Sequence, residues 1–230
     1  MTRTTNARLA GFTYLFYIAV AFPEMVLFDR ATDVQGTTAR LARIAEHAGD
    51  VRVAILLSVL ACFSAVVLAV ALYGITRDED RDLALIALAC RVGEGVTGAA
   101  GPLTMAALLW LATTSGPNAP DVAGATALAA VLVKLRGWSP TVGATFFAVG
   151  STIFSYLMLR GRMIPAWLAW LGVVGSALLV LGLPLQLAGV LRGSISQLMW
   201  IPIAVFELTV AVWLLVKGVA APRTKNALPR

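Results

Sequence analysis

The chain has 230 residues, of which 59% are hydrophobic and only 13% are charged, and its mean hydropathy is +0.85. These values exclude a soluble domain of this length and predict an integral membrane protein. The formal net charge of +6 does not indicate nucleic-acid binding, because the 18 Lys and Arg side chains lie mostly at the ends of apolar runs, where they anchor helices to headgroups.

The first apolar run, residues 9–28, predicts a membrane-spanning helix that follows Arg3 and Arg8. Its beginning resembles a signal peptide, and Ala19-Val20-Ala21 imitates a cleavage site. The run continues past that site and is long enough to span a bilayer. We therefore expect a retained span.

Within this first span, helical spacing places Tyr14, Tyr17 and Glu24 on one face. Two phenol hydroxyls would then line up with a carboxylate. Pro23 removes one helix hydrogen bond and leaves the carbonyl of Ala19 in need of a donor.

A polar loop, residues 29–52, precedes the second predicted span, residues 53–75. The middle of this loop, residues 38–48, carries its apolar residues on one side and its charged residues on the other. It is either a short amphipathic helix lying on the membrane or an ordinary solvated loop.

The third predicted span, residues 83–112, contains two charged side chains, Arg91 and Glu94. Helical spacing places both on one face with small residues and a proline: Gly95, Gly98, Gly101 and Pro102. Ionised groups that face lipid are costly, and glycines allow a second helix to approach closely. This face is therefore expected to pack against protein, and Gly101-Pro102 indicates a broken helix.

Residues 113–140 form a long predicted connection with an apolar segment, residues 122–135. About 14 residues are too few for a helix to cross the bilayer, so this segment is predicted to be an interfacial or re-entrant helix. Lys134, Arg136 and Trp138 then look like headgroup anchors.

Three further spans are predicted at residues 141–159, 164–191 and 198–217. The fifth span carries a seam suited to close helix contact, in which one amide stands among glycines: Gly172, Gly175, Gly182, Gln186 and Gly189. Pro184 is expected to bend or break this helix. The sixth span has Glu207 near its middle, and a short basic tail follows at residues 222–230.

The six spans predict an all-α, polytopic bundle made of one domain, residues 1–230, with both termini on the same side of the membrane. Ten positive charges flank the spans on the terminal side in short segments: Arg3, Arg8, Arg77, Arg81, Arg160, Arg162, Lys217, Arg223, Lys225 and Arg230. Seven are spread over the longer loops of the other side: Arg30, Arg40, Arg43, Arg52, Lys134, Arg136 and Arg192. The positive-inside rule therefore predicts cytoplasmic termini in a bacterial inner membrane.

Several short fragments, taken in order, resemble a known family. They are Arg8-Leu9-Ala10-Gly11, Ala89-Cys90-Arg91-Val92-Gly93-Glu94, Phe146-Phe147, Pro165 with Leu171-Gly172, and Glu207 followed by Trp213-Leu214-Leu215-Val216-Lys217-Gly218. The chain resembles, over nearly its whole length, the bacterial membrane-protein family catalogued as domain of unknown function 4386. The resemblance implies a shared multi-helix fold and no particular activity. Gly93 and Gly95 replace the bulkier residues expected beside Glu94, which implies closer local packing.

The buried charges suggest a function. Glu94 and Glu207 are expected near the membrane midplane, about 16 Å and about 14 Å from the nearer ends of their spans. Since charges at the bilayer centre are costly, we expect Arg91 to pair with one of these glutamates, while the other holds a proton or a cation. The predicted polar cluster is Arg91, Glu94, Glu207 and Glu24, with Tyr14, Tyr17 and Gln186 as supporting residues.

Two functions follow from this cluster. The first is proton- or cation-coupled transport of a small solute. The second is a structural, lipid-binding or partner-binding role, in which the buried ion pair only joins helices. We expect membrane lipids as partners, a possible homo-oligomer through glycine-rich helix faces, and no nucleic acid.

Enzymatic and cofactor-dependent functions find no support in the sequence. No histidine lies in a predicted span, and no Gly-x-Ser-x-Gly elbow is present. The single histidine, His47, excludes a bis-histidine haem, and Cys62 and Cys90 fall inside spans as small buried side chains. Residues 93–98 match the dinucleotide fingerprint Gly-x-Gly-x-x-Gly, but they lie within a membrane span with no strand before them. We therefore expect no cofactor and no metal.

Overall fold

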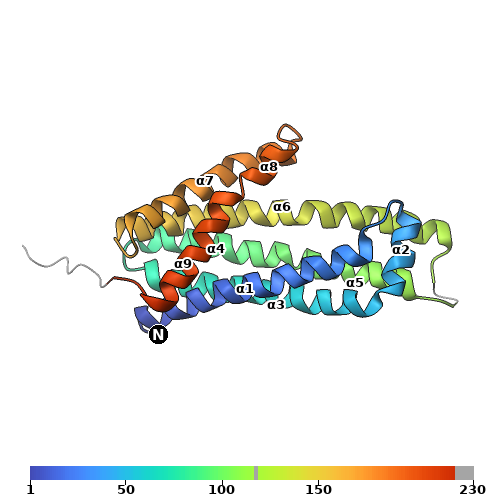
Figure 1. Ribbon diagram of the computed structural model, residues 1–230, viewed down its shortest axis with the longest axis horizontal. Coiled ribbons are helices and arrows are strands. Elements are labelled where there is room, and N and C mark those ends of the chain that lie inside the picture. The colour runs from blue at the N-terminus through green and yellow to red at the C-terminus, as the bar shows by residue number, and fades with distance from the viewer. Residues whose placement is uncertain (117–118, 221–230) are drawn as a thin grey trace, which may run out of the picture. The chain divides into compact units, whose positions relative to one another are not determined.

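The computed structural model describes residues 1–116 and 119–220, and these consist of α-helices and short connections (Figure 1). The helices are α1 (Arg3–Thr32), α2 (Thr37–Glu46), α3 (Ala48–Thr76), α4 (Arg81–Gly98), α5 (Ala100–Thr113), α6 (Val122–Arg160), α7 (Ala166–Leu187), α8 (Ser194–Leu198) and α9 (Ile201–Val216). Six helical segments are long and apolar enough to cross a membrane. The predicted all-α fold with six spans is confirmed. The basic tail predicted at residues 222–230 lies outside the described residues.

Most helices extend beyond the spans predicted from hydropathy. The first helix begins at Arg3 instead of residue 9, and the second begins at Ala48 instead of residue 53. Hydropathy marks only the apolar part of a helix, whereas the hydrogen-bonded backbone continues into polar ends. At the start of α1, for example, Arg3 Nε donates a hydrogen bond to the carbonyl of Ile75, 2.9 Å away, which holds this polar turn in place.

The segment 122–135 is not a separate interfacial or re-entrant helix. It forms the first turns of α6, a continuous helix of 39 residues that includes Pro140. Tertiary packing explains the difference, because Ala129 is buried and Leu132 and Val133 pack against the same hydrophobic cluster. A proline removes only one backbone donor, and membrane helices commonly accommodate that loss.

The third predicted span contains a break, as Gly101-Pro102 indicated. One helix ends at Gly98 and the next begins at Ala100. Because Pro102 has no N–H, it cannot donate a hydrogen bond to the carbonyl of Gly98. Ala99 N donates to Val96 O at 3.2 Å, which is the tighter spacing of a 3₁₀ turn. In contrast, α1 continues through Pro23 and α7 through Pro184, so the break predicted as one alternative at Pro184 is absent.

The segment predicted around residues 38–48 is the helix α2. Its Ile44 is fully buried and packs in a cluster with Phe28, Ala31 and Val51, while Leu41 lies against the same cluster. Helix α2 also contacts α5. The short helix predicted as one alternative is therefore confirmed, and the solvated-loop alternative is wrong. Part of the apolar face of α2 packs against protein, and its position on the membrane stays a prediction.

The chain forms two compact units, and α1, α3, α4 and α6 contribute residues to both. Unit 1 comprises Met1–Leu15, Val66–Gly93 and Ala144–Arg230, and unit 2 comprises Phe16–Ala65 and Glu94–Gly143. Each unit has its own hydrophobic cluster. The single domain predicted for residues 1–230 stays a prediction.

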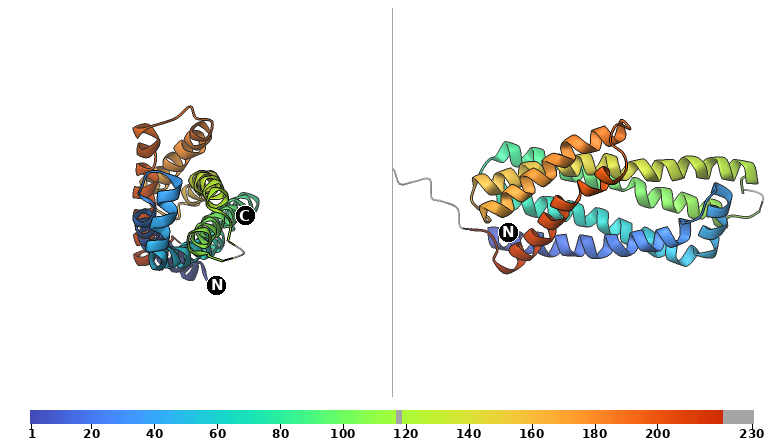
Figure 2. Two further views of the ribbon diagram at one scale, coloured as in Figure 1. Left: turned by 90° about the vertical axis from the view of Figure 1, so that its right-hand side faces the viewer. Right: turned by 45° about the horizontal axis from the view of Figure 1, so that its top comes forward.

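In unit 1, the glycine seam of α7 packs closely against its neighbours. A Cβ atom added to Gly172 would lie 2.6 Å from the ring of Phe206, and one added to Gly175 would lie 3.0 Å from the backbone nitrogen of Ile203. Helices α7 and α9 lie side by side with α8 between them in the chain (Figures 1 and 2). The predicted close helix contact is confirmed, and α9 of the same chain supplies the partner surface.

Candidate functional site

The residues of the predicted polar cluster are divided between the two units. Arg91 and Glu207 belong to unit 1, and Glu24 and Glu94 belong to unit 2. Arg91, Glu94 and Glu207 all take part in further interactions, so none of them lacks a partner. The pairing of Arg91 with Glu94 or Glu207 stays a prediction.

Arg91 is buried, with only 3% of its surface exposed. The centre of its guanidinium lies 4.7 Å from the ring centroid of Phe147 on α6, which is cation–π distance. A Cβ atom added to Gly150 would lie 2.9 Å from Arg91 Cγ, so this glycine makes room for the arginine stem. The charge of Arg91 therefore faces protein, as expected for a charged residue within a span.

The two fragments of α4 and α6 that carry the family resemblance contact each other in unit 1. Besides the Arg91–Phe147 contact, a Cβ atom added to Gly93 would lie 3.2 Å from the ring of Phe146. The glycines of this motif thus allow α4 and α6 to approach closely. This agrees with the packing expected from small residues beside Glu94.

In unit 2, Glu24 has a partner that the sequence analysis missed. Arg136 Nη2 of α6 donates a hydrogen bond to Glu24 Oε1 of α1 at 2.7 Å, which makes a charge-assisted pair. Their side chains are only 14% and 22% exposed. Both residues lie within membrane-spanning segments, so the pair combines a carboxylate and a guanidinium in an apolar surrounding.

Three helices surround the Arg136 guanidinium. The ring of Phe28, one turn beyond Glu24 on α1, lies 5.1 Å from the guanidinium centre. On α5, a Cβ atom added to Gly101 would lie 3.7 Å from Arg136 Nη1 and 3.6 Å from Ser58 Oγ. Among the described residues, Arg136 Nε is buried and has no hydrogen-bond acceptor. One donor of the guanidinium therefore stays available for an acceptor.

Hydroxyl groups of unit 2 connect α4 to α6. Thr97 Oγ1 donates to the carbonyl of Glu94 at 3.0 Å, and Ser139 Oγ donates to the carbonyl of Thr97 at 3.3 Å. Ser139 follows Arg136 by about one turn of α6. A Cβ atom added to Gly98 would lie 3.4 Å from Cys62 Sγ, so this thiol of α3 lies beside α4. Helices α4 and α6 thus share a hydroxyl–carbonyl contact about one turn from Arg136.

The predicted supporting residues are divided between the two units. Tyr14 is buried in the hydrophobic cluster of unit 1, whereas Tyr17 belongs to unit 2. Gln186 lies on α7 in unit 1, and its Oε1 is buried without a hydrogen-bond donor among the described residues. The supporting role of these three residues stays a prediction.

Arg136 was missed because it followed a segment interpreted as a loop helix and was read as a headgroup anchor. One signal could have identified it: residues 122–135 and 141–159 together form one long run interrupted by few charges. A continuous helix over both segments would place Arg136 within a span, where it needs a counter-ion.

The described residues contain no group of three or more His, Cys, Asp and Glu side chains that could hold a metal ion. Besides the Glu24–Arg136 salt bridge, the described polar groups of unit 2 include the hydroxyls of Thr97 and Ser139. A carboxylate can bind and release a proton, and a guanidinium can bind an anion.

Comparison with known proteins places the chain in a family. No curated protein and no solved structure gives a significant match. The family model described as Domain of unknown function (DUF4386) matches residues 9–218, which include all six membrane-spanning helices over most of their length. The fragments that carried the resemblance fall within this range, except for Arg8, which directly precedes it. The chain is a multi-pass membrane protein that belongs to the DUF4386 family.

Proposed function

We propose that this protein transports a small anionic solute together with protons, and that the pair of Glu24 and Arg136 couples the two. The observation that carries the proposal is a buried guanidinium with one carboxylate partner at 2.7 Å and an unused buried donor, Nε, among the described residues. A carboxylate or phosphate oxygen of a solute is the natural acceptor for such a donor.

Charge balance supplies the coupling. The two side chains are only 14% and 22% exposed, so each charge is largely removed from water, and the pair is stable because its two charges offset each other. When an anion binds Arg136, one negative charge too many is present unless Glu24 takes up a proton. The proposal therefore links one proton, carried by Glu24, to each singly charged anion that enters.

The break between α4 and α5 supports the same function. Gly101 lies at the start of α5 and faces Arg136 Nη1. Discontinuous helices expose backbone dipoles, and transporters commonly place bound ions and substrates at such breaks. Because Gly101 has no side chain, a solute at Arg136 would lie close to the backbone of α5 at this position.

The experiment uses the full chain in liposomes that contain a pH-sensitive dye. Acetate, lactate, succinate or inorganic phosphate is added outside at acidic pH, and internal acidification is followed. We expect at least one anion to accelerate acidification, and Glu24→Gln and Arg136→Gln to reduce that rate at least tenfold. The matched control is Glu46→Gln, at an exposed carboxylate at the end of α2. Equal rates in all three variants would refute the role of the pair.

A structural role is the second candidate, and the packing of Phe28 against Arg136 favours it. In this case the ion pair joins α1 to α6 within unit 2, and neither residue exchanges a ligand. The liposome assay would show no anion-dependent acidification in the unmodified protein, while Glu24→Gln would still lower the thermal stability.

The inner membrane and the cytoplasmic location of both termini belong to the same proposal. Their support is the excess of positive charge near the termini and in the short connections, for instance at Arg77, Arg81, Arg160 and Arg162. Arg160 contacts Glu79 and Asp80 at 3.1 and 3.2 Å, which brings two of these connections together in unit 1. This agrees with their predicted position on one side of the membrane.

A further inference from the structure

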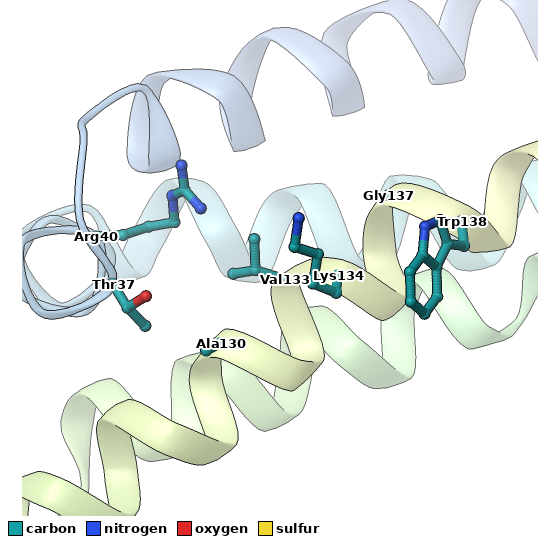
Figure 3. A pocket seen from close by; sticks show the side chains of 7 residues that line it. All are labelled: Thr37, Arg40, Ala130, Val133, Lys134, Gly137 and Trp138. Atoms are coloured by element: carbon teal, nitrogen blue, oxygen red, sulfur yellow. The ribbon is translucent and has the colours of Figure 1, made fainter. Parts of the chain in front are cut away.

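A pocket of about 500 Å³ lies in unit 2 between α2 and α6 (Figure 3). Arg40 and Thr37 line it from α2, and Val133, Lys134, Gly137 and Trp138 line it from α6. The described residues that line it include two cations, one hydroxyl group and one indole ring, and none of them is acidic. This composition suits an anionic group.

Arg40 is held in position by the connection between α1 and α2. Its Nε donates to the carbonyl of Thr32 at 3.0 Å, and its Nη2 donates to the carbonyl of Val34 at 3.2 Å. A guanidinium has five N–H donors, so these two bonds orient the group and leave others for a ligand. Figure 3 shows Arg40 and Lys134 extending into the opening between their helices.

Apolar surface continues from the pocket along α6. Two exposed apolar side chains, one helical turn apart, lead from the pocket toward the middle of α6: Trp138 is 61% exposed and Val142 is 40% exposed. Trp138 also belongs to the pocket lining. A free phosphate ion would make no use of these two side chains, whereas a lipid would place an acyl chain along them.

We propose that this pocket binds the phosphate headgroup of an anionic phospholipid. Arg40 and Lys134 contact the phosphate, Thr37 donates a hydrogen bond to it, and Trp138 lies at the level where headgroup meets acyl chain. Tryptophan and basic side chains are enriched at this level of a membrane. This site does not depend on the transport function, because it uses neither Glu24 nor Arg136.

The experiment titrates delipidated full-length protein in detergent with phosphatidylglycerol, and separately with phosphatidylcholine and with inorganic phosphate. Binding is measured by native mass spectrometry and by the rise in thermal unfolding temperature. Each cation near an anionic headgroup contributes about fivefold in affinity, so Arg40→Gln with Lys134→Gln should weaken phosphatidylglycerol binding roughly 25-fold.

Two further variants keep this test decisive. Lys134→Gln alone leaves the backbone contacts of Arg40 intact and should lose about fivefold, even if the double variant fails to fold. Arg81→Gln with Lys217→Gln, at exposed cations of unit 1, should change nothing. Equal affinity for phosphatidylglycerol and phosphatidylcholine, or equal losses in both double variants, would overturn the site. A response to inorganic phosphate as strong as that to the lipid would overturn the lipid as its ligand.

Discussion

Arg136 and Glu24 show how burial changes the role of a charged residue. The two positions are 112 residues apart in the chain, and their side chains meet at 2.7 Å. At a membrane surface each would be hydrated and the pair would be worth little. Inside a span, removal of one partner leaves an uncompensated charge, which costs about 3 kcal/mol or more.

The residue-scale prediction is a double-mutant cycle on this pair. Glu24→Gln and Arg136→Gln should each lower the free energy of unfolding by about 3 kcal/mol, while the double variant should lose about 2 kcal/mol less than their sum. Unfolding in detergent can be followed by the fluorescence of the six tryptophans. Strictly additive losses would mean that the two side chains do not interact.

At the scale of helices, glycines and prolines decide how the elements meet. Gly172 and Gly175 let α9 approach α7, and Gly11 lets α1 approach Ala211 of α9, where an added Cβ atom would lie 2.6 Å from its carbonyl oxygen. Pro102 interrupts a helix, whereas Pro23 lies in a continuous one. Near the interruption, Thr104 Oγ1 donates to the carbonyls of Ala100 and Gly101 at 2.8 and 2.7 Å.

The element-scale prediction concerns Gly172. Its replacement by Ala places a methyl group 2.5 Å from Ser155 Oγ and 2.6 Å from the ring of Phe206, so α7 must move away. Overpacking of this kind costs about 1 to 3 kcal/mol, and the thermal unfolding temperature should fall. Gly49→Ala, at a helical glycine with open space around it, is the control and should be neutral or slightly stabilising. An unfolding temperature unchanged in Gly172→Ala would show that the seam is loosely packed.

For the whole molecule, hydropathy was sufficient to predict six spans, and helical spacing was sufficient to predict the packed seam of α7. Neither could show that residues 122–135 continue into α6, because this continuity depends on contacts of Ala129 and Val133 with distant residues. For the same reason the partner of Glu24 could not be predicted: no local pattern links α1 to residue 136. The sequence identified buried charges and left their pairing to tertiary structure.

The whole-molecule prediction is the orientation. In a variant with Cys62 and Cys90 replaced by Ser, single cysteines are introduced as Asp33→Cys, Asp78→Cys or Asp121→Cys, all at exposed positions. With cytoplasmic termini, a membrane-impermeant maleimide added to intact cells should label positions 33 and 121 and leave position 78 unlabelled until the cells are permeabilised. The opposite pattern would place the termini outside.

The coupling of protons to anions at Arg136 is tested most directly by proton uptake on anion binding. The purified protein in weakly buffered detergent is mixed with acetate, lactate, succinate or inorganic phosphate, and the pH change and the bound anion are measured together. We expect one proton to be taken up for each singly charged anion bound, and both binding and uptake to be lost in Arg136→Gln. Anion binding without proton uptake would contradict this coupling. Proton uptake by Glu24→Gln equal to that of the unmodified protein would also contradict it.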